Sequence, residues 1–203
     1  LFLTHNSPFE IIKISPDGNV HALWSSSGPD LPWGIAVDAK GNVFATIVNS
    51  SILKIDIDGK VTTLAGSAEV GDEDGPGASA RFRLPLGIDV DNDGNLYVAD
   101  LLNYKIRKIT PDGTVSTLAG STYGYKDGIG ANAQFQGPYN VTVDAEGNVY
   151  VADGSRIRKV TSGGQVSTVA GSATAGYRDG TIANAQFNGI NGIAKDTAGN
   201  LYL

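Results

Sequence analysis

The densest cluster of possible metal ligands is a run of aspartates in the middle of the chain. Residues 89–100 read Asp-Val-Asp-Asn-Asp-Gly-Asn-Leu-Tyr-Val-Ala-Asp, which matches the spacing of a calcium-binding loop. Related segments elsewhere carry Ala or Thr in place of Asp89, and no helical pattern flanks any of them. We therefore interpret the run as an acidic hairpin. Asp89 stays the best candidate for a metal ligand, with calcium as the ion, because an acid on an inner strand is costly unless it is paired, hydrated or metal-bound.

A second acidic pattern recurs along the whole chain. An Asp-x-x-Gly-Asn motif begins at Asp38, Asp91, Asp144 and Asp196, with spacings of 53, 53 and 52 residues. An aspartate at the same position of every repeat is expected to have the same structural role in each repeat. We predict that each carboxylate accepts amide hydrogen bonds across its own Gly-Asn turn.

These acids lie on an internal repeat whose units predict short strands. An alternating Ile-x-Val segment precedes the Asp-x-x-Gly-Asn turn, and strands at 96–100, 105–109 and 115–118 follow, with an Asp-Gly hairpin turn at 112–113. One such meander cannot bury both of its faces, whereas radial repetition of the unit can. The sequence thus predicts an all-β fold, a β-propeller of four-stranded antiparallel blades spanning 1–203, with about four blades and repeats starting near residues 1, 43, 96 and 149.

Three of the repeats end in a long loop with a common motif. The loops cover 67–85, 121–138 and 172–190, and each contains Asp-Gly followed by Ala-x-Ala-x-Phe. Long loops inside a compact domain usually pack on something. We expect a short helical turn with a buried Phe in each. The corresponding loop of the first repeat, 25–32, is much shorter.

The repeats resemble those of NHL-repeat β-propellers. The resemblance rests on Pro85-Leu-Gly-Ile, the segment 91–100, Arg107-Lys-Ile-Thr-Pro-Asp-Gly and Ser116-Thr-Leu-Ala-Gly. It implies a propeller that is typically six-bladed. Members of this family are protein-binding modules, sensor ectodomains or RNA binders, and their relatives include gluconolactonase-like lactonases and amidating lyases. The lyases would bind zinc through several histidines, but this chain has two histidines.

The first and last residues occupy the same place in the repeat. Leu1-Phe-Leu3 is in register with Leu201-Tyr-Leu203. Either four blades close a ring through a split blade, or the chain is an arc of a larger propeller. We expect the arc, with further blades or domains outside this chain.

The loops before the first strand and after the second strand of each blade share one face, which is where propellers commonly bind ligands. Aromatic and amide groups there suit a peptide or a sugar. The predicted ligand-binding residues are Trp33, Tyr139, Asn140, Asn191, His5, Asp100 and Asp153. Two alternatives are open: Asp100 and Asp153 cap amides of their own loops, and Trp33 and Tyr139 serve loop packing.

Composition argues against several classes of function. The net charge of −6 disfavours a nucleic-acid binder, and we expect the Lys and Arg residues of the third strands to form a solvated, edge-proximal surface. No apolar run is long enough for a membrane span. The absence of cysteine excludes disulfides and cysteine nucleophiles. A Ser-His-Asp triad would need His5 or His21, and no nucleophile elbow is visible.

Three hypotheses for function follow. The first is a non-enzymatic recognition propeller, bacterial and extracellular, periplasmic or at the cell surface, that binds a protein, peptide or glycan around the central channel. The alternative is a metal-dependent, gluconolactonase-like hydrolase with an ion near Asp89, Asn140 and Asp153. The third is a purely structural module.

Overall fold

Five antiparallel sheets make up the computed structural model, which describes residues 1–6, 9–28, 30–182 and 184–203. Blade 1 contains β1 (Phe2–Asn6), β2 (Phe9–Ile14) and β3 (Val20–Ser26). Blade 2 contains β4 (Pro32–Val37), β5 (Val43–Ile47), β6 (Ser51–Ile55) and β7 (Val61–Gly66). Blade 3 contains β8 (Gly75–Pro76), β9 (Pro85–Val90), β10 (Leu96–Asp100), β11 (Lys105–Ile109) and β12 (Thr114–Gly120). Blade 4 contains β13 (Gly128–Ile129), β14 (Pro138–Val143), β15 (Val149–Asp153), β16 (Arg156–Val160) and β17 (Gln165–Gly171). Blade 5 contains β18 (Ala194–Lys195) and β19 (Leu201–Tyr202).

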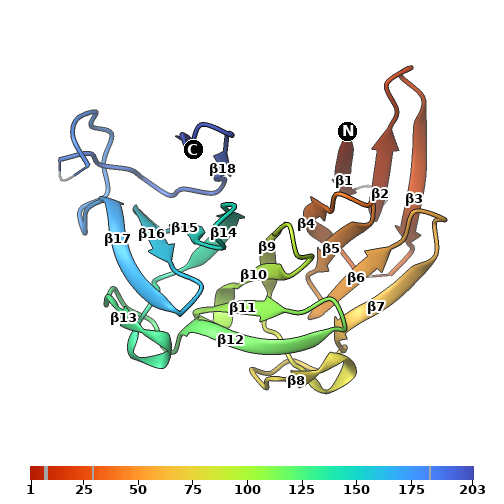
Figure 1. Cartoon of the computed structure of the whole chain (residues 1–203), viewed down its shortest axis with the longest axis horizontal. Coiled ribbons are helices and arrows are strands. Elements are labelled where there is room, and N and C mark those ends of the chain that lie inside the picture. The colour runs from red at the N-terminus through yellow and green to blue at the C-terminus, as the bar shows by residue number, and fades with distance from the viewer. Residues whose placement is uncertain (7–8, 29, 183) are drawn as a thin grey trace.

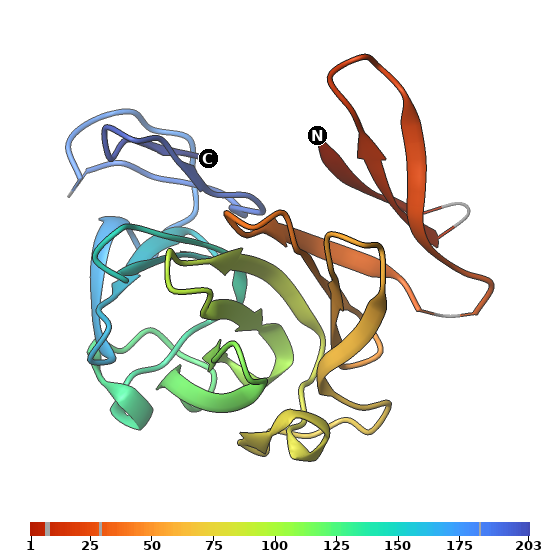
Figure 2. The ribbon, with the colours of Figure 1, turned by 45° about the vertical axis from the view of Figure 1, so that its right-hand side comes forward.

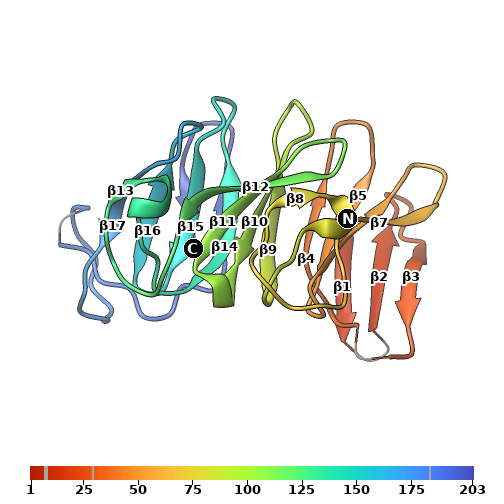
Figure 3. The ribbon, with the colours of Figure 1, turned by 90° about the horizontal axis from the view of Figure 1, so that it is seen from below.

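The sheets stand next to one another around an open arc, as Figure 1 shows. Seen from below in Figure 3, most strands stand roughly upright, antiparallel within each sheet, and the sheets lie side by side. The innermost strands β4, β9 and β14 are neighbours in space and line the inside of the arc. Among the described strands, β1 pairs with β2 and β19 pairs with β18, so blades 1 and 5 remain separate sheets. The predicted all-β propeller architecture is therefore confirmed.

The recurring aspartates hold the turns of the inner hairpins, as predicted. Asp91 Oδ1 accepts hydrogen bonds from the amides of Asp93 and Asn95 at 3.0 and 2.8 Å, and Oδ2 accepts one from Asn95 Nδ2 at 2.9 Å. Asp144 makes the equivalent bonds to Glu146 and Asn148. Each Gly of these turns has a positive φ, for example 84° at Gly94, which a residue without Cβ adopts at low cost.

Apolar side chains fill the spaces between blades. Between blades 2 and 3 the core contains Phe44, Ile88 and Leu96, all at most 5% exposed. Between blades 3 and 4 the residues Tyr97 and Val151 belong to an equivalent cluster. Every sheet thus covers an apolar face of its neighbour, which is how the repeat stabilises itself.

Two of the three long connecting loops follow the prediction and add a feature to it, whereas in the described part of loop 172–190 Phe187 is only half-buried, so the prediction of a buried Phe is wrong there. Loops 67–84 and 121–137 contain the short 3₁₀ helices η1 (Gly77–Ser79) and η3 (Gly130–Asn132), and Phe82 and Phe135 are fully buried. Each loop also adds a two-residue strand to the next blade, because β8 pairs with β12 and β13 pairs with β17. Figure 2 shows the yellow loop that carries β8 lying along β12. The outer edges of blades 3 and 4 are therefore covered, which the prediction of four-stranded blades did not include.

We expect Asp144→Ala to lower the free energy of unfolding by about 1–3 kcal/mol at pH 7, because three hydrogen bonds of the turn lose their acceptor. Burial pushes the pKa of Asp144 upward, but hydrogen bonds from Asn148 and Glu146 outweigh it, so the pKa lies below 3.8. The stabilisation is therefore present above that value and is lost as pH falls through the folded-state pKa.

Urea unfolding at pH 7 and at about pH 3 measures this. Glu146→Ala, which removes an exposed acid from the same turn, is the control and should change little. A difference between Asp144→Ala and the parent that is equally large at both pH values would contradict the assigned role.

Candidate functional site

The mouth of the arc carries an aromatic pair contributed by two different blades. Trp33 in β4 and Tyr139 in β14 meet edge to face, with ring centroids 6.0 Å apart and an interplanar angle of 74°. Trp33 is 40% exposed although it belongs to an inner strand. The structure thus brings together two predicted residues that are 106 positions apart in the sequence. We call this pair, with Asn140, the channel mouth.

Asn140 lies beside the aromatic pair and packs closely on the neighbouring blade. A Cβ atom placed on Gly87 would approach Asn140 Cα to 2.5 Å, so glycine is needed at that position of β9. Asn140 Oδ1 accepts a hydrogen bond from the Val141 amide at 2.7 Å. Within the described contacts its Nδ2 group has no acceptor, which makes it a hydrogen-bond donor for a ligand at the channel mouth.

Of two other predicted ligand-binding residues, Asn191 lies elsewhere, and the side chain of His5 is not described. Asn191 precedes β18, is exposed, and lines a separate hollow together with Tyr177 and Leu203. His5 belongs to β1, where it is paired with Glu10. The side chain of His5 lies outside the described part of the structure, so its predicted ligand contact stays a prediction.

The carboxylate of Asp89 connects two blades. Its Oδ2 accepts hydrogen bonds from Thr142 Oγ1 at 3.0 Å and from the Val143 amide at 2.8 Å, and its Oδ1 accepts one from the Val90 amide. These hydrogen bonds offset the free-energy cost of placing a carboxylate on an inner strand. That cost was the reason for selecting Asp89 as the candidate metal ligand. In the part of the chain that the structure describes, no group of three His, Cys, Asp or Glu side chains converges. A metal at Asp89 remains a prediction that would require these bonds to rearrange.

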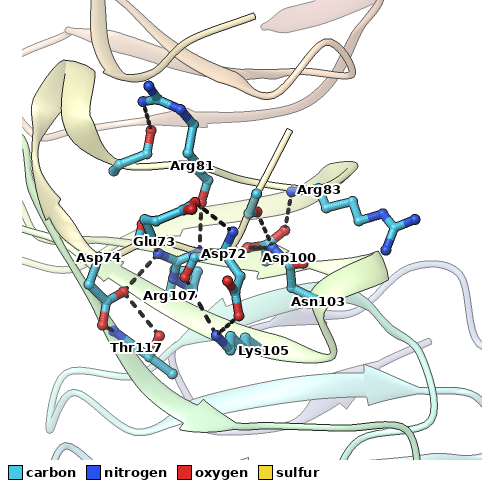
Figure 4. A network of polar contacts seen from close by, with 12 residues as sticks. Asp72, Glu73, Asp74, Arg81, Arg83, Asp100, Asn103, Lys105, Arg107 and Thr117 are labelled. Carbon is cyan, nitrogen blue, oxygen red and sulfur yellow. Dashed lines mark hydrogen bonds and ion pairs between the residues drawn. The ribbon is translucent and has the colours of Figure 1, made fainter. Parts of the chain in front are cut away.

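Asp100 takes part in a buried network around Arg107, drawn in Figure 4. Both side chains have no exposed surface. Arg107 Nη1 donates to Asp100 Oδ2 at 2.7 Å and to the Arg81 carbonyl at 2.9 Å. Arg107 Nη2 donates to Asp74 Oδ1 at 2.7 Å and to the Glu73 carbonyl at 2.8 Å. The guanidinium group also lies 5.0 Å from the centre of the Phe82 ring, which adds a cation–π interaction.

Blade 4 repeats this network with different residues. Arg158 donates to Asp153 at 2.9 Å, to Asp127 at 2.7 Å, and to the carbonyls of Gln134 and Lys126. Its guanidinium group lies 5.2 Å from the Phe135 ring centre. We call the two sets the arginine clusters of blades 3 and 4. In each, the arginine belongs to the third strand of a blade, and most of its acceptors belong to the long loop that precedes that blade.

The expectation of a solvated third strand is therefore wrong for Arg107 and Arg158. Alternate residues of the strand face the covering loop, and the loop was expected to lie elsewhere. Lys108 and Lys159 face the other way, where they lie over the rings of Tyr97 and Tyr150.

Burial and pairing set the acidity of the cluster carboxylates. Burial raises the pKa of Asp100 and of Asp153, although hydrogen bonds from backbone amides and the arginines act in the opposite direction. Asp127 is closer to solvent; burial acts upward there too, but bonds from Thr168 and Arg158 outweigh it and lower the pKa. Two buried charges of opposite sign need extensive pairing to be tolerated, and here the Nη groups are paired while Nε of Arg107 and of Arg158 has no hydrogen-bond partner among the described residues. Asp100 and Asp153 thus have structural partners, and ligand contact by either one stays a prediction.

The sequence carried a signal for the arginine clusters in the repeat itself. Blade 2 has Ile47 and Leu53 at the positions of Asp100 and Arg107, as the strand register shows. The loop before blade 2 is also the short one. Blades 3 and 4 therefore share three features that blade 2 lacks. These are a long preceding loop, an aspartate at the end of the second strand and an arginine in the third strand. Their joint occurrence indicates that they act together.

The comparisons with known proteins agree with this architecture. The profile of the Teneurin NHL domain matches residues 124–191. NHL repeat-containing protein 2 of Bos taurus is 36% identical over 88 residues, which is 41% of this chain. Residues 124–191 thus match an NHL domain, and the described sheets have the arrangement of a β-propeller.

Two further similarities extend over more of the chain. Protein SUPPRESSOR OF QUENCHING 1, chloroplastic, of Arabidopsis thaliana is 35% identical over 139 residues, or 63% of the chain. The crystal structure of an auxiliary nutrient binding protein from Bacteroides thetaiotaomicron superimposes with a TM-score of 0.74 at 19% identity, covering 94% of this chain and 49% of that one. This likeness concerns the fold. The chain spans about 12% of the two curated relatives and about half of the solved structure.

We expect Arg158→Leu to lower the free energy of unfolding by about 3–5 kcal/mol, since it leaves Asp153 buried without its counter-ion. The double variant Asp153→Ile/Arg158→Leu copies the pair that blade 2 carries naturally and should regain part of the loss. Urea unfolding of the three proteins measures both effects. A double variant less stable than Arg158→Leu would contradict the account of an uncompensated buried charge.

Proposed function

We propose that this chain forms part of a recognition propeller, which binds a protein, peptide or glycan at the channel mouth without catalysing a reaction. The observation that supports this most strongly is the Trp33–Tyr139 pair. Two aromatic rings, one of them 40% exposed, meet across an intervening blade at the centre of the arc. An exposed aromatic surface next to a free amide donor fits the usual composition of a recognition site.

The position of the site also supports binding. The rings come from inner strands that the interblade cores and the arginine clusters hold in place, so a ligand would meet a preformed surface. Preformed surfaces lose little conformational entropy on binding. The names of the relatives do not define the ligand, because the chain covers a small part of the curated ones and resembles the solved structure in fold.

Where such a protein would act follows from the same proposal. A ligand-binding propeller outside the cytoplasm, extracellular, periplasmic or at the cell surface, suits the acidic chain with a net charge of −6. Among the described residues, no helix has the length and apolar character to cross a membrane. Further blades, if the polypeptide contains them, would extend the same face.

The test uses a displayed random-peptide library and a glycan array as probes. We expect Trp33→Ala and Tyr139→Ala to weaken binding of the selected ligands at least about 30-fold, the size of effect typical of aromatic hot spots. The melting temperature should change little, because Trp33 is exposed and Tyr139 is half-buried.

Tyr177→Ala is the matched control, since Tyr177 is 89% exposed and lies on the third long loop. Ligands should bind this variant as they bind the parent protein. Equal binding by Trp33→Ala, Tyr139→Ala and the parent would overturn the assignment of the channel mouth.

A further inference from the structure

A hollow of about 280 Å³ lies at the boundary of blades 1 and 2. Strands β5, β6 and β7, the end of β3 and the short segment before β4 surround it. We call it the blade 2 hollow, and its main lining residues are Trp24, Asp30, Ile47, Asn49, Leu53 and Thr63. None of these side chains belongs to the channel mouth or to an arginine cluster.

The hollow occupies the position that the arginine clusters fill in the next two blades. Ile47 and Leu53 stand in the register positions of Asp100 and Arg107. Thr63 stands at the position of Thr117, whose amide and hydroxyl bind Asp74 in blade 3. Blade 2 therefore lacks both the guanidinium group and the loop that covers it.

Two differences in sequence determine the size and the lining of this space. The segment between β3 and β4 is short, so it adds no loop across blade 2. In addition, Trp24 occupies a register position where the later blades have Ala65, Ala119 and Ala170. The indole group packs on the core around Ile11, and part of its surface lines the hollow. Trp24 thus offers an aromatic surface to the blade 2 hollow, as Phe82 does to the guanidinium group of Arg107 in blade 3.

The charge of the hollow matches a cation. Asp30 is half-buried and accepts a hydrogen bond from Asn49 Nδ2, and Ser51 in turn donates to Asn49 at 3.1 Å. Among the described residues, the salt bridges of the structure do not include Asp30. A fixed carboxylate beside an indole surface favours a planar cation, because guanidinium both pairs with carboxylate and stacks on aromatic rings.

We propose that the blade 2 hollow binds an arginine side chain of an extended peptide segment in a partner protein. The volume supports a single side chain, since pockets for whole small molecules are typically about 300–1,000 Å³. The arginine clusters of blades 3 and 4 are internal precedents for a guanidinium group at this place in a blade.

This inference rests on the proposed function in one respect, because it makes the recognised partner a peptide with a positively charged side chain. The two sites are close in sequence, since Asp30 precedes Trp33 by three residues. They can nevertheless be tested apart. The chain has two tryptophans, Trp24 at the hollow and Trp33 at the channel mouth, and each can report on its own site.

The experiment is a fluorescence titration of the full chain in a Trp33→Phe background, which leaves Trp24 as the reporter. The probe is the tripeptide acetyl-Ala-Arg-Ala-amide, and its partner probe carries citrulline, which has the shape of arginine without the charge. We expect a saturable change in Trp24 fluorescence with the arginine peptide, and binding at least about tenfold weaker with the citrulline peptide.

Two variants locate the effect. Asp30→Asn should weaken binding of the arginine peptide about tenfold or more, whereas Asp58→Asn, which removes an exposed charge from the same blade, should leave it unchanged. Leu53→Arg puts an arginine of the chain itself into the hollow and should abolish binding. If Asp30→Asn fails to fold, as circular dichroism would show, Leu53→Arg still tests the site.

No saturable change with the arginine peptide, or equal affinity for the citrulline peptide, would overturn the inference. Failure of the channel mouth has a different signature. In that case ligands from the library would bind Trp33→Ala normally, while the Trp24 titration would still respond to arginine.

Discussion

Two buried guanidinium groups hold the long connecting loops of this molecule against its blades. Arg107 and Arg158 each bind two carboxylates and two loop carbonyls while stacking near a phenylalanine ring. The bonds to Arg107 and Arg158 offset part of the conformational entropy that these two loops lose when they are ordered. With the loop in place, the outer strand of the blade is paired and Phe82 or Phe135 is driven into the interblade core. The cores in turn set the positions of the inner strands that carry the channel mouth.

Most of the architecture could be predicted from the sequence because it repeats. The spacing of Asp38, Asp91 and Asp144 defines the unit, and the role of these residues follows from the short reach of an aspartate side chain to amides of its own turn. The buried phenylalanines of the loops were predictable for the same reason. A repeated motif must satisfy the same local geometry each time, so one interpretation has to fit all copies.

The repeat signals that the arginine, the aspartate and the long loop belong together, but the individual partners of each arginine could not be assigned, because they are distant in sequence. Arg107 binds Asp74, which lies 33 positions earlier in a loop whose path depends on the finished blades. Taken alone, the Ile-Arg-Lys-Ile segment has the pattern of a half-solvated strand. In the folded protein the long loop covers the strand and buries its arginine. Asp89 is a similar case. Its oddity in the sequence pointed to a metal, whereas in the structure the neighbouring blade supplies Thr142 and Val143 as donors. Trp33 and Tyr139, by contrast, were both expected at the same face of the arc, although the contact between their rings was not predicted.

The departures from the repeat indicate where function lies. In blades 3 and 4 the cluster arginines bind carboxylates and loop carbonyls of the chain itself. Both Nη groups of each arginine have hydrogen-bond acceptors. At the boundary of blades 1 and 2, Trp24 of β3, Asp30 before β4 and Leu53 of β6 surround an open hollow instead. Trp33 and Tyr139 stand where blade 3 has a buried leucine, Leu86. Side chains at these positions do not make the internal contacts that the other blades share, so they can contact a partner.

Amide hydrogen exchange of the parent chain and Arg158→Leu tests the central claim most directly. The amide of Thr168 donates to Asp127, and the loop amides of Gly130 and Gln134 donate to the carbonyls of Gly164 and Lys126. The account predicts that these three amides lose protection in Arg158→Leu by a larger factor than the amides of β15, because the loop opens while the inner hairpin stays folded. Equal loss of protection in the loop and in β15, or no loss in the loop, would contradict it.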